Sequence, residues 1–199
     1  MLVIGLTGPT GAGKGEFGRL AREEFGALHI DTDRTAREVV EPGKPCLDAL
    51  VKTFGSKILA ADGSLDRRAL GGIVFADKEK LQTLNAVTHP FITKEVRRTL
   101  EDAETRGITL AVIDAPLLFE AGEDAICDVT VGVVAPERVR LARILARDGV
   151  TEKAARSRIA SGKSTAFFAS RCDVLLANAA DLASFTAASS AVLRALLSR

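Results

Sequence analysis

The segment GPTGAGK, from Gly8 to Lys14, lies directly between an apolar run and a pattern typical of a helix. Its spacing, G-x-x-x-x-G-K in this context, predicts a loop that binds the phosphates of a nucleotide. Glycines let the backbone curl until successive N–H groups point at the β-phosphate, and the helix start adds partial positive charge. Lys14 would supply a full charge between the β- and γ-phosphates. The alternative is a glycine-rich turn with a surface lysine, and the three glycines, the lysine and the flanks together disfavour it.

The residue after Lys14 departs from the usual pattern of such loops. A serine or threonine usually stands there, and its hydroxyl helps to hold Mg²⁺. This chain has Gly15 instead, followed by Glu16. Either Mg²⁺ is held through water and acidic residues or it is held weakly, and the sequence leaves both possibilities open.

Aspartates follow two of the short apolar runs. Asp31 and Asp33 come after the run Leu28–Ile30, and Asp114 closes a later one. Ligands of an open α/β sheet bind at the carboxyl ends of its strands, where a carboxylate can accept a proton from an attacking hydroxyl or help to hold Mg²⁺ through water. The alternatives are that one of the first two only caps the helix expected over Thr32–Val40, and that Asp114 simply ends a strand.

Three arginines recur at helical spacing further along the chain. Arg140, Arg143 and Arg147 share one face of the helix expected there. The simplest interpretation is a solvated face that pairs with Glu137 and Asp148. In a kinase whose lid covers the γ-phosphate, the same face would close on the phosphates and offset the charge of the transition state.

A second segment, SGKST from Ser161 to Thr165, has the form of only the tail of a phosphate loop. The first glycine of a complete loop would stand at the place of Ser157, and the segment follows a helix where a strand is needed. We therefore expect no second phosphate loop, and Lys163 remains a candidate for a lysine of a lid.

Short apolar runs alternate with helical patterns along the chain, which predicts an α/β protein with a largely parallel sheet. Helices are expected over Lys14–Phe25, with Gly26 just past its end, and over Leu182–Leu197, with Asp181 as its cap. The five predicted strands are Leu2–Thr7, Leu28–Ile30, Thr109–Asp114, Val129–Val134 and Val174–Ala177.

The segment between the second and third strands is too long for one crossover helix. Turn signals at Glu41-Pro42-Gly43, Ala61-Asp62-Gly63 and His89-Pro90 divide it into several helices, which we interpret as an insertion over one edge of the sheet. His89 is either a structural hydrogen-bonding residue at a helix junction or a substrate contact. A second helical pair, Pro136–Arg147 and Thr151–Ser161, separates the fourth and fifth strands.

Composition excludes several other classes of protein. The chain of 199 residues has 27 Lys+Arg and 26 Asp+Glu, so no global positive field points to nucleic acid or to an anionic membrane. Its three cysteines are far apart and include no CxxC, which is typical of reduced thiols in a cytoplasmic protein. No apolar run approaches the roughly 18 residues of a membrane span, and the apolar N-terminus lacks the basic region of a signal peptide.

Taken together, these residues resemble the dephospho-coenzyme A kinase family. The likeness covers about nine-tenths of the chain in the right order, and its combination of D-x-D, H-P and P-L-L-F-E elements is specific. It rests on Leu6-Thr7-Gly8 and the phosphate loop, Asp31-Thr32-Asp33, Ala36 to Gly43, Asp62 to Arg67, Val74-Phe75, Leu84-Asn85, His89-Pro90, Asp114 to Glu120, Arg143 and Arg147-Asp148-Gly149, and it ends near Asp173 and Asn178.

The resemblance implies a P-loop kinase that phosphorylates the ribose 3′-hydroxyl of dephospho-coenzyme A with ATP and Mg²⁺, an alcohol-accepting phosphotransfer and the last step of coenzyme A synthesis. It implies one P-loop NTPase domain over 1–199: a core over about 1–40, 107–135 and 172–199 with helices on both faces of the sheet, a helical acceptor-binding insertion over about 41–106, and a lid over about 136–171. ATP and dephospho-coenzyme A are the expected partners of a cytoplasmic protein, with a monomer favoured and neither nucleic acid nor membrane expected.

Carried over by position, the resemblance and the motifs predict the site residues. The catalytic group is Asp33 as base, Lys14 and Arg143. The ATP-binding residues are Gly8, Thr10, Gly11, Ala12, Gly13, Lys14, Gly15, Glu16 and Arg147; the substrate-binding residues are Asp31, His89, Pro116, Leu117 and Leu118; the metal residue is Asp114.

Besides Gly15, two residues depart from the family pattern. Gly162 stands where the lid helix usually ends with glutamine, and Cys172 stands where alanine usually precedes the aspartate of the last strand. These changes concern the lid and leave the loop, Lys14 and Asp33 intact. The rival hypotheses are a kinase for another small acceptor, such as a nucleoside monophosphate, and a nucleotide-binding relative that transfers nothing.

Overall fold

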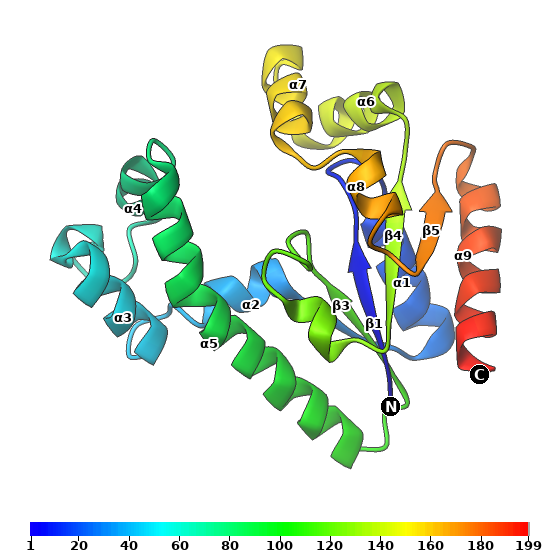
Figure 1. Cartoon of the computed structure of the whole chain (residues 1–199), viewed down its shortest axis with the longest axis horizontal. Coiled ribbons are helices and arrows are strands. Elements are labelled where there is room, and N and C mark those ends of the chain that lie inside the picture. Colours follow the sequence, from blue (N-terminus) through cyan, green and yellow to red (C-terminus); the bar gives the residue numbers. More distant parts are fainter. Residues whose placement is uncertain (199) are drawn as a thin grey trace. The chain divides into compact units, whose positions relative to one another are not determined.

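The computed structural model describes residues 1–198, and the chain divides into two compact units (Figure 1). One unit, here the sheet unit, combines residues 1–30 with the chain from Ala103 onward. The other, here the helical unit, is Asp31–Asp102. Each is described by itself below.

A five-stranded sheet forms the framework of the sheet unit. The strand order is β2-β3-β1-β4-β5, and β1 pairs with β3 and β4, and β4 with β5, all in parallel. Because parallel strands share a direction, the loops that follow β1, β4 and β5 leave the sheet at one edge. The strands are β1 (Leu2–Thr7), β2 (Leu28–Asp31), β3 (Leu110–Asp114), β4 (Val129–Val134) and β5 (Val174–Ala177).

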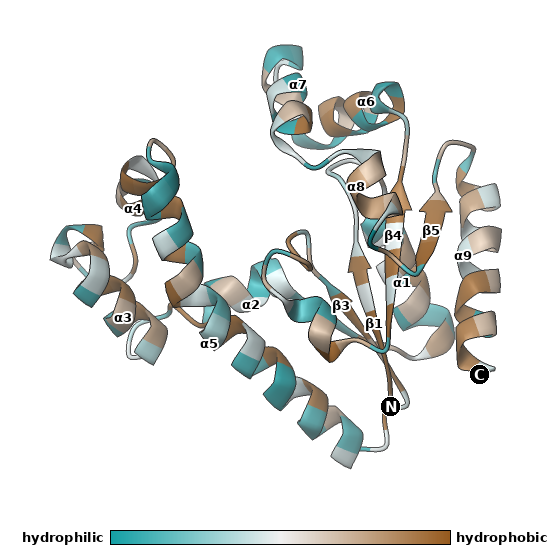
Figure 2. Cartoon of the chain, in the orientation of Figure 1, coloured by the Kyte–Doolittle hydropathy of each residue, from teal (hydrophilic) through white to brown (hydrophobic). Residues whose placement is uncertain are grey.

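Two helices cover one face of the sheet. Phe17 and Leu20 of α1 (Lys14–Phe25) share a core with Phe185 and Leu193 of α9 (Leu182–Leu197) and with alternate residues of the strands. Figure 2 shows the strands and α9 as predominantly hydrophobic, as buried parallel strands must be. Gly26 and Asp181 take the capping positions expected of them.

Glycines make room for side chains on the other face. A Cβ atom on Gly5 would lie 2.8 Å from Cys127 Sγ and 2.9 Å from Leu118, and one on Gly132 would lie 2.8 Å from Cys172 Sγ. This face is therefore covered by the segment after β3, by the 3₁₀ helix η2 (Glu123–Ile126), by α8 (Thr165–Ala169), which contacts β4, and by Cys172 just after it.

Three short helices separate β4 from β5: α6 (Glu137–Asp148), α7 (Glu152–Ser161) and α8 (Thr165–Ala169). Ile144, Ala155 and Ile159 form a small separate core between the first two. The expected helical pair is thus present, and Thr151 caps its second member. The pattern did not predict α8, which starts at its cap Ser164. A helix precedes SGKST, so the prediction that this segment is not a phosphate loop is confirmed.

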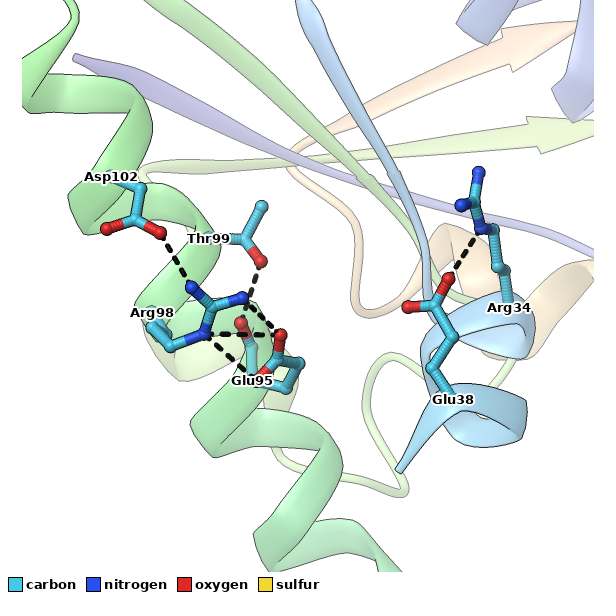
Figure 3. Close-up of polar contacts among 6 residues, drawn as sticks. All are labelled: Arg34, Glu38, Glu95, Arg98, Thr99 and Asp102. Carbon is cyan, nitrogen blue, oxygen red and sulfur yellow. Dashed lines mark hydrogen bonds and ion pairs between the residues drawn. The ribbon is translucent and has the colours of Figure 1, made fainter. Parts of the chain in front are cut away.

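The helical unit contains α2 (Thr32–Glu38), α3 (Pro45–Phe54), η1 (Ser56–Ile58), α4 (Arg67–Val74) and most of α5 (Lys78–Thr105). The turns expected at Pro42-Gly43 and Asp62-Gly63 are confirmed, with positive φ at both glycines. Asp66 and Asp77 accept backbone N–H groups at the starts of α4 and α5. In α2 and α5, ion pairs join neighbouring turns of the helix (Figure 3).

One predicted boundary is wrong. His89-Pro90 does not end a helix, because α5 runs from Lys78 to Thr105 with Pro90 inside it. A proline removes one donor from a helix and disturbs the turn before it, but the long helix on both sides carries the chain through. His89 therefore lies within a helix and not at a junction. The α2 helix also ends earlier than expected, at Glu38 and not at Val40.

None of the helices in residues 1–198 is both long and apolar enough to cross a membrane.

Candidate active site

The loop between β1 and α1 has the backbone that a phosphate cradle needs. Gly8, Gly11 and Gly13 have φ values of 141°, 76° and 103°, which disfavour any other residue. Space also requires glycine, because a Cβ atom would collide with the Val133 carbonyl at Gly8 and with the Asn178 amide at Gly13. The curled backbone is closed by a hydrogen bond from the Ala12 N–H to the Pro9 carbonyl oxygen, 3.1 Å long.

Lys14, the first residue of α1, bends back over this loop. Its Nζ donates to the Gly8 carbonyl oxygen at 3.0 Å. The ammonium group thus contacts the first residue of the loop, and Lys14 itself begins a helix of 12 residues. The ammonium charge and the partial charge of the helix N-terminus are both positive and favour a bound phosphate.

Two side chains from other elements clamp the loop at the carbonyl of Ala12. The buried Asn178 donates through Nδ2 to this oxygen at 2.9 Å, and Arg143 Nη1 donates to it at 3.2 Å. Arg143 Nη2 in turn donates to Asn178 Oδ1 at 2.9 Å. The loop is therefore held in shape by a closed network and not by its glycines alone.

The topology of the sheet explains this network. Asn178 directly follows β5 and its N–H donates to the Val134 carbonyl at the end of β4, while α6 with Arg143 follows β4. The predicted site residues did not include Asn178. Its position just after the last predicted strand was the one available signal, since that is where the ligands of parallel sheets bind.

The arginine face of α6 is not simply solvated. Arg140 is 8% exposed, its Nη1 lies 3.5 Å from the Thr10 carbonyl oxygen, and its buried Nε has no hydrogen-bond acceptor among the described residues. Arg143 contacts the loop, as described above. Of the three arginines, only Arg147 pairs at the surface as the interpretation of a solvated face predicts. It donates to Asp148, which also accepts a hydrogen bond from Arg158 of α7. These two arginines lower the pKa of Asp148.

The two unusual residues after Lys14 have different surroundings. A Cβ atom on Gly15 would meet no described atom within 4 Å, so packing does not require glycine there. Glu16 forms an ion pair with Arg19, whose hydrogen bonds lower the pKa of the Glu16 carboxyl group. The pair offsets a negative charge that would otherwise stand beside the phosphate cradle.

Asp114 ends β3 opposite Leu6 in the register of β1, just before the loop begins. Its Oδ2 lies 3.7 Å from His29 Nε2, and Gly18 of α1 leaves the space that the imidazole fills. In residues 1–198 no three His, Cys, Asp or Glu side chains group as a metal site. One carboxylate together with substrate phosphates and water is nevertheless a donor set that suits Mg²⁺.

A cavity of about 610 Å³ in the sheet unit is connected to the phosphate loop through Arg140, which lines the cavity and lies 3.5 Å from the Thr10 carbonyl oxygen. Val134 and Ala177, at the ends of β4 and β5, form part of its wall together with Arg140, Ile159 and Lys163. Its volume lies within the range of small-molecule sites.

The segment after β3 places its predicted substrate-binding residues differently. Pro116 and Leu117 are exposed, Leu117 at 48%, although Leu117 is a large apolar residue. Leu118 is fully buried against the Gly5 side of the sheet. Its side chain belongs to the core, so the prediction that it contacts substrate is not supported, whereas Pro116 and Leu117 are available to a ligand.

In the helical unit, the structure separates the roles of the two neighbouring aspartates. Asp31 caps α2, since its Oδ1 accepts the N–H groups of Asp33 at 2.9 Å and Arg34 at 3.2 Å. Asp33 lies exposed in the first turn of that helix. His89 is half-buried in α5. A separate cavity of about 380 Å³ in this unit is lined by Pro42, Gly43, Leu47, Asp48, Val51, Lys52, Leu59 and Gly63.

Comparison with known proteins assigns the chain to a family. The family model described as dephospho-CoA kinase matches residues 2–184. A dephospho-CoA kinase of Moorella thermoacetica is 45% identical over 168 residues, covering 83% of this chain and 79% of the relative. One of Corynebacterium glutamicum is 40% identical over 199 residues, covering 100% and 99%.

A solved structure supports the fold. The dephospho-CoA kinase from Campylobacter jejuni superposes with a TM-score of 0.70 at 24% identity, covering 96% of this chain and 95% of that one. The expected P-loop kinase fold is confirmed by this likeness and by the five-stranded sheet. The chain therefore belongs to the dephospho-CoA kinase family, whose reaction is the final step of coenzyme A synthesis.

Proposed function

We propose that this protein transfers the γ-phosphoryl group of ATP to the ribose 3′-hydroxyl of dephospho-coenzyme A, an alcohol group, and so yields coenzyme A and ADP. The observation that carries the proposal is the phosphate loop, whose curled backbone is clamped by Arg143 and Asn178 in a chain of this family. Such transfer depends on positioning and charge stabilisation more than on covalent chemistry by the protein.

The residues of the sheet unit would hold the nucleotide. The loop from Gly8 to Gly13 offers its N–H groups to the β-phosphate, and Lys14 turns from the Gly8 carbonyl to the β- and γ-phosphates. The cavity whose wall includes Arg140 and Lys163 would receive part of the nucleotide. The buried Arg140, with a donor that has no described acceptor, lies in its wall and can bind the nucleotide there.

Asp114 would help to hold Mg²⁺ together with the substrate phosphates, and the metal would supply positive charge for the transferred group. Gly15 contributes no hydroxyl, so the metal depends on phosphate oxygens, water and this one carboxylate. Arg143 and Arg147 belong to the segment we propose as a lid, and Arg143 already contacts the loop.

Asp33 is the proposed base that accepts the proton of the 3′-hydroxyl. The structure assigns a different task to the neighbouring Asp31, whose carboxylate accepts the backbone N–H groups of Asp33 and Arg34 at the start of α2. His89, Pro116 and Leu117 are the proposed contacts of the acceptor. We further propose a monomer that acts in the cytoplasm, where its three free cysteines remain reduced.

The test is incubation of the purified protein with ATP, Mg²⁺ and dephospho-coenzyme A, followed by mass spectrometry of the acceptor. We expect one added phosphate with the wild type, almost none with Lys14→Ala, and wild-type product with Lys153→Ala, which removes an exposed lysine of α7. If the protein phosphorylates only another small acceptor, that compound is its substrate in place of dephospho-coenzyme A. ATP binding without transfer to any acceptor would contradict kinase activity.

A kinetic comparison tests the base. Asp33→Asn should lower kcat by about 10²- to 10⁴-fold with little change in ATP affinity. Asp31→Asn keeps a good helix cap and should lower kcat much less. Equal losses of kcat and ATP affinity in Asp33→Asn would instead indicate a structural aspartate.

A further inference from the structure

The segment between α7 and α8 carries a lysine that is held from outside the segment. Lys163 Nζ lies 3.6 Å from Glu120 Oε1, in the segment after β3, and 5.1 Å from the centroid of the Phe167 ring. The Glu120 carboxylate and the Phe167 ring, from different parts of the chain, thus fix the position of the Lys163 ammonium group.

Aromatic rings fix the backbone around this lysine. The guanidinium of Arg171 lies 4.9 Å from the centroid of Phe167 and 5.5 Å from that of Phe119, and these two rings meet edge to face at 6.0 Å. Phe168, buried at 3% exposure, packs edge to face on Phe167. Cation–π and edge-to-face contacts of this kind stabilise a segment where few apolar residues are buried. The backbone near Lys163 is therefore anchored, while its side chain is half exposed to solvent.

Lys163 also lines the cavity of about 610 Å³ that Arg140 connects to the phosphate loop. The charged residues in the cavity wall are Glu137, Arg140 and Lys163, which leaves one net positive charge. Arg140 adds the buried Nε that has no acceptor among the described residues. The cavity thus suits a ligand that is anionic and rich in hydrogen-bond acceptors.

The pair between Lys163 and Glu120 is weak enough to exchange. The two side chains are 52% and 28% exposed, and exposed ion pairs of this kind contribute little stability because water screens them. A polyphosphate brings several negative charges and more oxygen acceptors than one carboxylate. The lysine can therefore leave Glu120 for a bound nucleotide at small cost.

We propose that Lys163 is a phosphate-binding residue of the nucleotide site, and that Glu120 competes with the nucleotide for it. This inference rests on the proposed function only in taking a nucleoside triphosphate as the ligand of the sheet unit. In the free protein Lys163 pairs with Glu120; with nucleotide bound, Lys163 adds a second positive charge to that of Lys14.

The test measures the dissociation constant of ATP with Mg²⁺ by calorimetry, without acceptor. Lys163→Ala should raise Kd by about five- to thirtyfold, because a charged hydrogen bond is lost. Glu120→Gln should lower Kd by about two- to fivefold, because the competitor is lost. Lys163→Arg should restore most of the affinity, and Glu120→Gln should have no effect in the Lys163→Ala background.

Controls separate this inference from other outcomes. Lys153→Ala removes a nearby exposed lysine that does not line the cavity, and should leave Kd unchanged. The loss in Lys163→Ala should be smaller for ADP and near zero for adenosine. Shifts of Kd in the same direction for Lys163→Ala and Glu120→Gln, or an equal loss for adenosine, would overturn the proposal. Failure of the wild type to phosphorylate dephospho-coenzyme A while it binds ATP would contradict only the proposed function.

Discussion

Polar contacts are built differently in the two units. In the sheet unit, the contacts that shape the phosphate loop join residues far apart in the chain, such as Asn178 and Ala12. In the helical unit, the contacts of Figure 3 join neighbouring turns of one helix: Arg98 lies between Glu95 and Asp102 of α5, and Arg34 reaches Glu38 of α2.

The difference concerns burial as much as distance along the chain. Asn178 is 5% exposed, and its amide has both oxygen and nitrogen satisfied by protein groups. Arg98 is 59% exposed, its partner Asp102 is exposed as well, and its partner Glu95 is half-buried. A buried hydrogen bond is costly to break, because the group left behind loses both partner and water, whereas an exposed ion pair is replaced by hydration. The sheet unit should therefore be far more sensitive to removal of one polar side chain.

The largest effect is expected from Asn178→Ala. The change removes the donor to the Ala12 carbonyl and the acceptor of Arg143, so unfolding free energy should fall by about 2–4 kcal/mol and Kd for ATP should rise at least about tenfold. Chemical denaturation and ATP titration measure the two quantities.

Gln82→Ala, which removes an exposed amide of α5, serves as the matched control and should change stability by less than about 0.5 kcal/mol. Arg143→Ala combined with Asn178→Ala should cost less than the sum of the two single changes, because they share one network. If the two losses of unfolding free energy add fully, Asn178 and Arg143 do not act as one network.

Glu123 lies outside the candidate active site and tests how burial of a carboxyl group affects stability. This side chain is 2% exposed, and burial raises its pKa to about 7. Between its ordinary pKa and pH 7, the folded state keeps a proton that the unfolded state loses, so stability falls as pH rises through that window. Glu123→Gln removes this dependence and should be more stable than the wild type at pH 8, by at most about 3 kcal/mol.

Near pH 4.5 the two proteins should differ much less. Thermal unfolding at both pH values measures the difference. Glu101→Gln, an exposed change on α5, should show no such pH dependence. The same stability difference for Glu123→Gln at both pH values would contradict a raised pKa.

Gly15→Ser should give a smaller change in stability and sharpen the metal question. The open space around Gly15 accepts the side chain, and serine in a helix is favoured over glycine by about 0.5 kcal/mol. Its hydroxyl should lower the Mg²⁺ concentration needed for half-maximal activity by about two- to tenfold. Gly15→Ala should stabilise the helix without changing the Mg²⁺ requirement; an identical Mg²⁺ response in both variants would exclude the hydroxyl as ligand.

The smallest effect is expected from Arg98→Ala. It removes the centre of the ladder in Figure 3, yet the melting temperature should stay within about 2 °C of the wild type because all three groups are hydrated. Differential scanning calorimetry at low and high salt measures it. If the melting temperature falls strongly at low salt and does not fall at high salt, exposed ion pairs do stabilise the helical unit.

Much of the fold could be predicted because its signals are local. The limits of β1, α1, β4, β5 and α9 agree with their apolar runs and caps, and the phosphate loop follows from the spacing of its glycines. The continuous helix through Pro90 could not be predicted in this way. A proline signals a break locally, whereas the length of α5 on both sides keeps the helix intact.

The sequence by itself determined the loop, the five strands, the first and last helices and the resemblance to a kinase family, because each depends on residue types at short spacing. Only the tertiary structure decided which side chains close on the loop. Asn178 and Arg143 contact Ala12 because they follow β5 and β4, which lie on the same side of β1 in the sheet. No pattern of residues along the chain predicts that these strands are neighbours. Strand order is chosen by the burial of whole faces, and residues brought together by it carry no local pattern.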